Sequence, residues 1–142
     1  TARPDETVRE AAKRMDARGV GILVVVDEDA RPVGALTDRD VVLRVLRRRR
    51  DPDHTKVSDV MQDEVSVVRE ASPLALAARR MRADGVRRMP VVDEEGKLTG
   101  IVTVDDVLQL VSTELVGVAE AVRSQFPADL EGERALGPTT GG

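Results

Sequence analysis

The sequence has no cysteine, tryptophan or tyrosine, and it has one histidine, His54, and one phenylalanine, Phe126. Without cysteine the chain can form no disulfide, no thiolate metal site and no cysteine nucleophile. One histidine excludes a metal or catalytic site that needs two imidazoles. The lack of tryptophan and tyrosine excludes stacking of a base between two aromatic rings. A flat heterocycle bound here would therefore have to lie against aliphatic side chains and backbone.

The sequence also lacks a long hydrophobic run and an excess of positive charge. No apolar segment approaches the roughly 18 residues that a membrane span needs, and no signal peptide is visible. The formal net charge of −4 disfavours generic nucleic-acid binding. With 41% hydrophobic and 34% charged residues, the composition predicts a folded cytoplasmic protein without a membrane partner. The chain begins at Thr1 rather than at methionine, so we expect that an upstream segment has been removed.

The chain contains an internal repeat. A shift of 66 residues carries GALTDRD at 34–40 onto GIVTVDD at 100–106, and it carries VVDE at 25–28 onto VVDE at 91–94. The register holds from Met15 to Val45 without a gap. Similarity over such a length at one fixed shift indicates duplication. One chain therefore holds two copies of the same structural unit.

Each copy predicts the order helix, strand, strand, helix. In the first copy, apolar residues at helical spacing end at Gly19, which is typical of a helix C-terminus. A β-branched run, a turn and a second strand follow, and then a helix with acidic residues in its first turn. In the second copy Ser72 is the expected N-cap with Pro73 as the first helical residue. A short lead-in helix capped by Ser58 is expected before it.

Neither copy has room for a large core of its own, so the two should pack face to face about a pseudo-twofold axis. A polar linker separates them, and apolar spacing continues beyond the second copy into a longer helix. The glycine- and proline-rich end of the chain predicts disorder. The expected organisation is a first repeat at 1–50 that lacks its N-terminal lead-in, a linker at 51–56, a second repeat at 57–115, a helical extension at 116–126 and a disordered tail at 127–142.

Thr37 and Asp40 lie at the predicted junction between the second strand and the following helix. Unpaired backbone N–H groups and the helix dipole attract anions there. A threonine hydroxyl can reach a phosphate oxygen, and an aspartate one turn later can accept two hydrogen bonds from a cis-diol such as that of ribose. Alternatively, the threonine is only the helix cap and the aspartate only a favourable first-turn charge. Both interpretations apply equally to Thr103 and Asp106.

The doubled patterns Met-x-x-x-Gly-Val, Val-Val-Asp and Gly-x-x-Thr-x-x-Asp resemble the cystathionine-β-synthase (CBS) domain. Two copies in tandem resemble a Bateman module, and the TDRD form of the first motif resembles the stand-alone bacterial kind. The resemblance covers nearly all of residues 1–115. It implies an α/β (α+β) fold in which two pseudo-twofold-related β-α-β-β-α repeats pack through their small sheets. Members of this family bind adenine nucleotides or related adenosyl ligands in clefts between the repeats.

The resemblance also implies which residues line the two clefts. Each cleft would combine the Thr/Asp corner of one repeat with the loop and strand start of the other, with apolar contacts and a lead-in strand. The expected residues are Thr103, Asp106, Val20, Gly21 and Ile22 for one cleft, Thr37, Asp40, Val86, Arg87, Arg88 and Ser66 for the other, and Ile101 and Ala35 as further apolar contacts.

The two clefts should differ in charge. Arg87 and Arg88 stand where family members often place basic residues on nucleotide phosphates, whereas the first copy has Gly21 and Ile22 at these positions. The two clefts are therefore expected to differ in affinity. An exposed cationic loop without a ligand is the alternative interpretation of the two arginines.

The sequence predicts a non-enzymatic regulatory module that senses AMP, ADP, ATP or S-adenosylmethionine and that needs no other cofactor, metal or catalytic residue. A ligand-free, stress-associated dimeric scaffold is the alternative. An unidentified target protein would read either state. An apolar stripe on the last helix favours a homodimer, although it could also cover the module's own core. The stripe comprises Leu110, Val111, Leu115, Val118, Ala119 and Val122.

Overall fold

A computed structural model of the chain describes residues 1–125. The chain divides into two units, residues 1–107 and the part that begins at Leu108. The first unit holds both repeats, and helix α4 (Val104–Gln125) provides the described part of the second. The disordered tail predicted at 127–142 and residue Phe126 lie outside the described residues.

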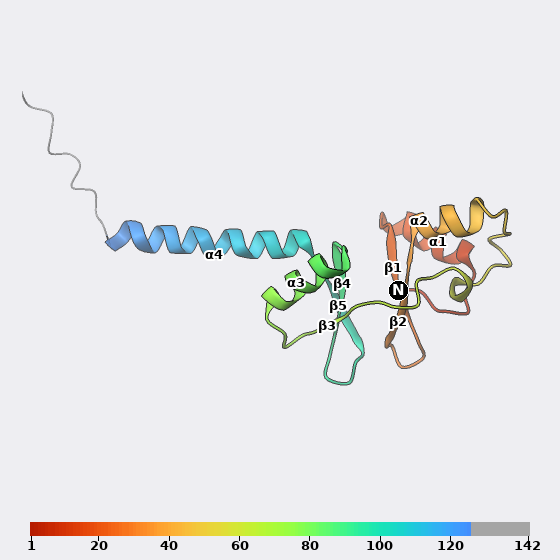
Figure 1. The fold of residues 1–142 in the computed structure, drawn as a ribbon, viewed down its shortest axis with the longest axis horizontal. Helices are drawn as coiled ribbons and strands as arrows, with labels where there is room; N and C mark the ends of the chain where they lie inside the picture. The colour runs from red at the N-terminus through yellow and green to blue at the C-terminus, as the bar shows by residue number, and fades with distance from the viewer. Residues whose placement is uncertain (126–142) are drawn as a thin grey trace, which may run out of the picture. The chain divides into compact units, whose positions relative to one another are not determined.

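The first repeat begins with a helix and a hairpin (Figure 1). A reciprocal capping box between Thr7 and Glu10 starts α1, and Gly19 ends it in the left-handed conformation with φ 60°. The predicted C-terminal glycine is therefore confirmed at Gly19. The elements of this repeat are α1 (Val8–Arg18), β1 (Ile22–Val26), β2 (Pro32–Thr37), a single helical turn α2 (Asp38–Asp40) and a π-helix η1 (Val41–Leu46).

The second repeat follows the same order after a 3-10 helix. β3 pairs in parallel with β4, and β4 pairs with β5 in an antiparallel hairpin in which Arg88 lies opposite Thr103. The 3-10 helix is η2 (Val57–Asp59), and the elements of the repeat that follows it are β3 (Val68–Arg69), α3 (Leu74–Asp84), β4 (Arg88–Val92), β5 (Leu98–Thr103) and α4. Together with the first repeat they form an α+β fold, which confirms the predicted class.

Backbone flanks the hairpin of the first repeat on both edges. Ala2 pairs in parallel with Val25, as Val68 pairs with Val91 in the second repeat. Ala2 therefore occupies the edge position whose lead-in the sequence predicted to be missing. On the other edge, Gln62 pairs in antiparallel orientation with Ala35 of β2.

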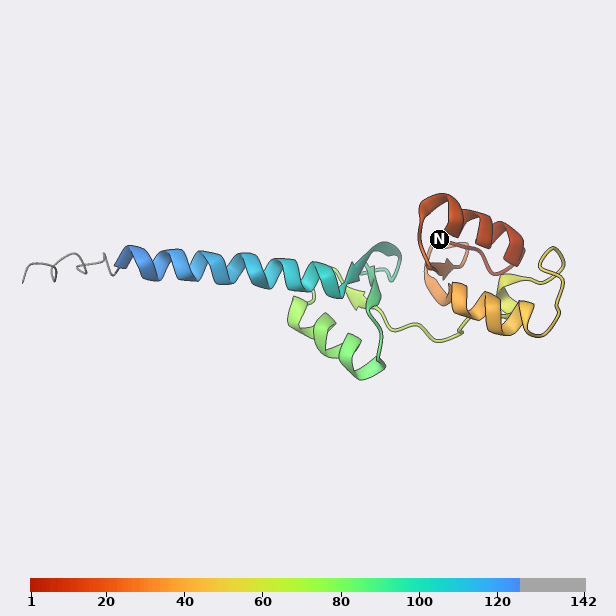
Figure 2. The ribbon, with the colours of Figure 1, turned by 90° about the horizontal axis from the view of Figure 1, so that it is seen from above.

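The first repeat has the larger core, and segments from both sides of the linker build it. α1 and η1 pack with one face of the β1–β2 hairpin, and the two helices are seen from above in Figure 2. Val57 and Val60 are buried in the same cluster. The chain therefore leaves the first repeat only after η2, although the sequence placed this segment at the start of the second. The second core centres on Val68, Ala77, Met81 and Met89.

Two predicted helix caps are wrong. The 3-10 helix η2 follows Lys56, so Ser58 lies inside the helix rather than at its cap. At α3 the N-cap is Pro73, whose extended ψ of 138° makes Leu74 the first helical residue, and no side chain caps this helix. Ser72 therefore lies one position before the cap. Because Pro73 has no N–H, the start of α3 has one unsatisfied donor fewer.

Candidate functional site

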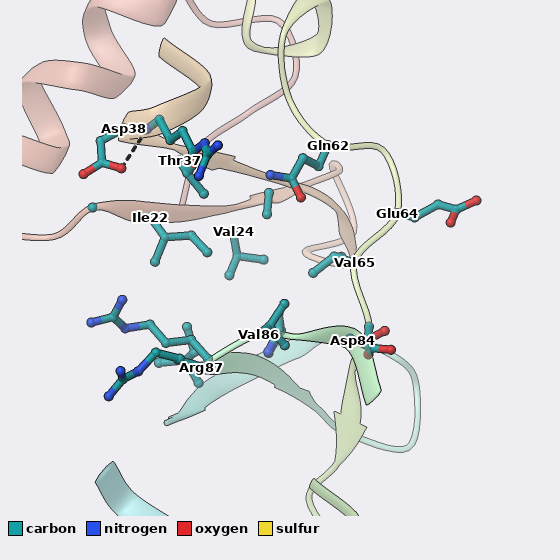
Figure 3. A pocket seen from close by; sticks show the side chains of 17 residues that line it. Ile22, Val24, Thr37, Asp38, Gln62, Glu64, Val65, Asp84, Val86 and Arg87 are labelled. Carbon is teal, nitrogen blue, oxygen red and sulfur yellow. Dashed lines mark hydrogen bonds between the residues drawn. The ribbon is translucent and has the colours of Figure 1, made fainter. Parts of the chain in front are cut away.

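A groove of about 550 Å³ lies between the hairpins of the two repeats (Figure 3). Because strand side chains alternate between the two faces of a sheet, one face of β1–β2 packs on the helices and the other is free to line the groove. Leu23, Val25 and Leu36 lie in the core, whereas Ile22 and Val24 point into the groove. The alternating direction of the side chains along β1 therefore places Ile22 and Val24 in one wall of the site.

The walls of the groove are mostly aliphatic. The first repeat contributes Ile22, Val24 and Ala35, and the second contributes Pro90 and Ile101. Ile101 is 44% exposed, although it lies on a strand. Aliphatic side chains on two facing hairpins are suited to a flat apolar group, and they need no aromatic ring.

Charged side chains of both signs line the groove. Arg87 lies at one end, and Glu64 and Asp84 lie at the other (Figure 3). Arg39, Arg88 and the acidic Asp38 also line it. Arginine guanidinium groups donate several hydrogen bonds to phosphate or carboxylate oxygens. The groove can therefore hold a ligand with an anionic end and an apolar body.

The loop before β1 meets the start of the following helix at Gly21. The backbone N–H of Asp38 donates to the Gly21 carbonyl over 3.0 Å. A Cβ atom at Gly21 would lie only 2.8 Å from Asp38 Oδ2. In the second repeat Arg87 takes the place of this glycine, and Val104 donates to the Arg87 carbonyl over 3.0 Å. A side chain at position 21 would therefore require the Asp38 carboxylate to move, whereas the second repeat carries an arginine at the equivalent position.

The corner between β2 and α2 is a closed hydrogen-bond network. Asp40 is 7% exposed, and its Oδ2 accepts from Thr37 N (3.1 Å), Thr37 Oγ1 (2.5 Å) and Gln62 Nε2 (3.1 Å). Its Oδ1 lies 3.5 Å from Arg44 Nε. Thr37 and Asp40 therefore form a reciprocal capping box at the start of α2. Thr37 and Gln62 line the groove, whereas Asp40 lies behind them.

The corner between β5 and α4 has the same cap but is exposed. Asp106 Oδ2 accepts from Thr103 N (2.8 Å) and Thr103 Oγ1 (2.6 Å), and Asp106 N donates to Thr103 Oγ1 (3.1 Å). The bond from the Thr103 hydroxyl, followed by that from the backbone, lowers the pKa of the Asp106 carboxyl below its ordinary value. Thr103 and Asp106 therefore also form a reciprocal helix cap.

The groove gathers most of the predicted site residues but not the full set. Those that line it are Gly21, Ile22, Ala35, Thr37, Ser66, Val86, Arg87, Arg88 and Ile101. Those that do not are Val20, Asp40, Thr103 and Asp106. All residues predicted for the Asp40 cleft, except Asp40 itself, therefore line this groove. The assignment of Gly21 and Ile22 to the Asp106 cleft is wrong, because both line this groove, and the Thr103–Asp106 corner stays outside it.

Sequence reasoning missed several groove residues. Arg39 lies within the TDRD motif itself, so its position beside Thr37 was a usable signal. Gln62, Glu64 and Val65 come from the connection between the repeats, and Asp84 ends α3. No local pattern marks the first three, because their place depends on the path of the chain between the two hairpins, and Asp84 carries no motif of its own.

The described residues contain neither a candidate metal-binding cluster nor a helix that could span a membrane. Within residues 1–125 no three acidic or histidine side chains gather as they would around a metal ion. None of the helices in this range has the length and apolar character to cross a bilayer.

Comparisons with known proteins point to one family. The chain is 39% identical over 130 residues to the uncharacterized protein MK0525 of Methanopyrus kandleri, which covers 92% of this chain and 66% of that protein. It is similar to the cytosolic domain of the Mg²⁺ channel MgtE solved in complex with ATP, with 37% identity, a TM-score of 0.66 and coverage of 77% and 43% of the two chains. This chain thus spans less than two thirds of these relatives.

A third similar structure is the CBS domain pair of protein MJ0100 in complex with 5′-methylthioadenosine and S-adenosyl-L-methionine. It has a TM-score of 0.67, 26% identity and coverage of 80% of this chain and 87% of that one. The model of the CBS domain matches residues 1–47 and again residues 57–113. The two matched segments are the two copies that the 66-residue shift aligns. The chain therefore belongs to the CBS domain family, of which it carries a tandem pair.

Proposed function

We propose that this CBS pair is a regulatory module that binds an adenine nucleotide or a related adenosyl ligand in the groove between its hairpins. The observation that carries the proposal is the lining of the groove. Aliphatic side chains of both repeats face each other, and Arg87 lies at one end. The solved relatives in complex with ATP and with S-adenosyl-L-methionine support the same class of ligand.

The lining suggests one binding mode. The adenine would lie between Ile22 on one hairpin and Ile101 on the other, where no aromatic ring is needed. The phosphates would be held by Arg87 and Arg88, as charge-assisted hydrogen bonds to phosphate are strong. The hydroxyl of Thr37 would lie beside the sugar.

Regulation follows from the ligand's contact with both repeats. A ligand held between two hairpins stabilises the one relative orientation of the hairpins that fits it. Its binding free energy therefore biases an equilibrium between two orientations, and a target protein would read the difference. This module needs no catalytic group for that role.

Isothermal titration calorimetry with AMP, ADP, ATP and S-adenosylmethionine tests the proposal. At least one ligand should bind the wild type, and Arg87→Ala should weaken a phosphate-bearing ligand about tenfold. Arg69→Ala is the matched control, because Arg69 is an exposed arginine of the same repeat that does not line the groove. Absence of binding by every ligand at millimolar concentration would contradict the proposal.

The apolar stripe of α4 supports a homodimer as part of this function. Val111, Leu115 and Val118 of this stripe follow one another at intervals of four and three residues, the spacing of a coiled-coil seam. They are 44%, 64% and 61% exposed. Pairing of two such helices would remove this surface from water.

A ligand-free scaffold is the second candidate, and the Asp40 network favours it. The carboxylate predicted to hold a ribose is already bonded to Thr37 and Gln62. Thermal unfolding that no nucleotide shifts, together with a stable dimer in light scattering, would support the scaffold over the sensor.

A further inference from the structure

The side chain of Gln62 lies between the groove and Asp40. Gln62 lines the groove, and its Nε2 donates to Asp40 Oδ2 over 3.1 Å. In Figure 3 the Gln62 amide points toward Thr37, the other groove residue that bonds to this carboxylate. A ligand in the groove therefore meets Gln62 and Thr37 before it can meet Asp40.

The backbone holds Gln62 firmly at this place. Gln62 N donates to the Ala35 carbonyl over 2.8 Å, and Ala35 N donates to the Gln62 carbonyl over 3.0 Å. Gly34 permits the approach, because a Cβ there would lie 2.5 Å from the Gln62 carbonyl oxygen. Arg44 Nη1 also donates to the carbonyls of Val60 and Met61. The segment is thus fixed by contacts that do not involve the Gln62 side chain.

Gln62 is the donor to Asp40 that a ligand can replace. The two bonds from Thr37 belong to the helix cap, and Arg44 approaches the other carboxylate oxygen. The Gln62 amide can rotate away about its side-chain bonds while both backbone bonds to Ala35 remain. A ligand hydroxyl could then donate to Asp40 Oδ2 in place of the amide N–H.

The second repeat supplies the contrast. Within the described part of the chain, the hydrogen bonds at the Asp106 carboxylate come from Thr103 alone, and the residue is exposed. The duplicated corners therefore differ in one respect that matters for a ligand. Among residues 1–125, Asp40 carries an additional donor from the connection between the repeats, and Asp106 does not.

We propose that Gln62 determines the specificity of the groove by competing with the ligand's sugar hydroxyls for Asp40. The inference rests on the proposed function, which supplies a ligand with a cis-diol. A diol that binds Asp40 displaces the Gln62 amide from the corner. Binding therefore changes a contact of the very segment that leads from one repeat to the other. A ligand without the diol leaves the amide in place.

The test compares AMP with 2′,3′-dideoxy-AMP by calorimetry on the wild type, Gln62→Ala and Gln62→Met. Loss of the competing amide should tighten AMP binding about tenfold in both variants, because AMP no longer has to replace a hydrogen bond to a charged group. Binding of the dideoxy analogue should not change. Gln62→Met keeps the length of the side chain, so it separates loss of the hydrogen bond from gain of space.

The outcomes are distinct. If the wild type binds AMP and neither variant binds it more tightly, or if the dideoxy analogue gains as much as AMP, the competition is refuted and the proposed function stands. A gain confined to Gln62→Ala would also overturn the inference, since space alone would explain it. If no protein binds AMP while another adenosyl ligand does, the inference fails for AMP-type ligands. If nothing binds, the inference and the proposed function fall together.

Discussion

At the scale of the residue, both Thr/Asp corners are helix caps. Thr37 and Thr103 each cap a helix and each bond to the aspartate three residues later. The helix cap alone explains why the aspartate follows the threonine by three residues. A ligand contact must therefore be added to the cap or exchanged for part of it, and Gln62 marks the corner where such an exchange would occur.

The lowered pKa of Asp106 gives a prediction for Thr103. Because the Thr103 hydroxyl is the largest cause of the lowering, Thr103→Val should raise the pKa toward the ordinary 3.8. Thr103→Ser keeps a hydroxyl and should keep the pKa low. The contribution of this cap to stability is fully present above pH 3.8 and is lost as the pH falls through the lowered pKa. Carboxyl carbon shifts followed by NMR against pH measure it, and equal midpoints in the wild type and Thr103→Val would refute the assignment.

At the scale of the element, the two hairpins differ in what passes along their outer strands. At β2 the chain before the second repeat comes within hydrogen-bonding distance, and Gly34 leaves it room. At β5 the equivalent Gly100 has no atom within 4 Å of a Cβ position among the described residues. The glycine is thus required in one copy, and in the other no contact explains it.

This difference predicts unequal effects of one substitution. Gly34→Ala should lower the free energy of unfolding by about 1–3 kcal/mol, because the new methyl group meets the Gln62 backbone. Gly100→Ala is the matched control, and its effect should lie within about 0.5 kcal/mol. Urea unfolding followed by circular dichroism measures both. Equal effects in the two repeats would show that the close approach at Gly34 is not tight in solution.

The elements also show what the sequence could and could not predict. Gly19 was predicted to end α1 because a glycine tolerates the left-handed conformation, and its φ of 60° confirms it. The order of helices and strands followed from apolar spacing. In contrast, the burial of Val57 and Val60 in the first core could not be foreseen. Apolar spacing reports which face of a segment is buried, but not which repeat buries it.

The same limit applies to the site. Ile22, Arg87 and Ile101 were predicted from the family pattern, and they meet in the groove. Gln62 and Asp84 were missed, since they come from a connection and a helix end that carry no motif. Asp40 was predicted as a ligand contact, and its bond to Gln62 could not be read from two positions that lie 22 residues apart.

At the scale of the whole molecule, the apolar stripe of α4 predicts a dimer. Multi-angle light scattering should give twice the mass of the 15.4 kDa chain. Leu115→Glu should shift the protein toward the monomer, because it places a charge in the middle of the apolar seam. Glu114→Gln alters a neighbouring exposed position without adding a charge to the seam. A monomeric wild type, or a dimer that tolerates Leu115→Glu, would contradict the prediction.

The central claim for the whole molecule is that the groove between the hairpins holds an adenosyl ligand. A crystal structure of the protein with the tightest nucleotide from the calorimetric series tests this claim most directly. The account predicts density for the adenine between Ile22 and Ile101, with the phosphates at Arg87 and Arg88. An empty groove at millimolar nucleotide, or a nucleotide bound only on the outer surface of either repeat, would contradict it.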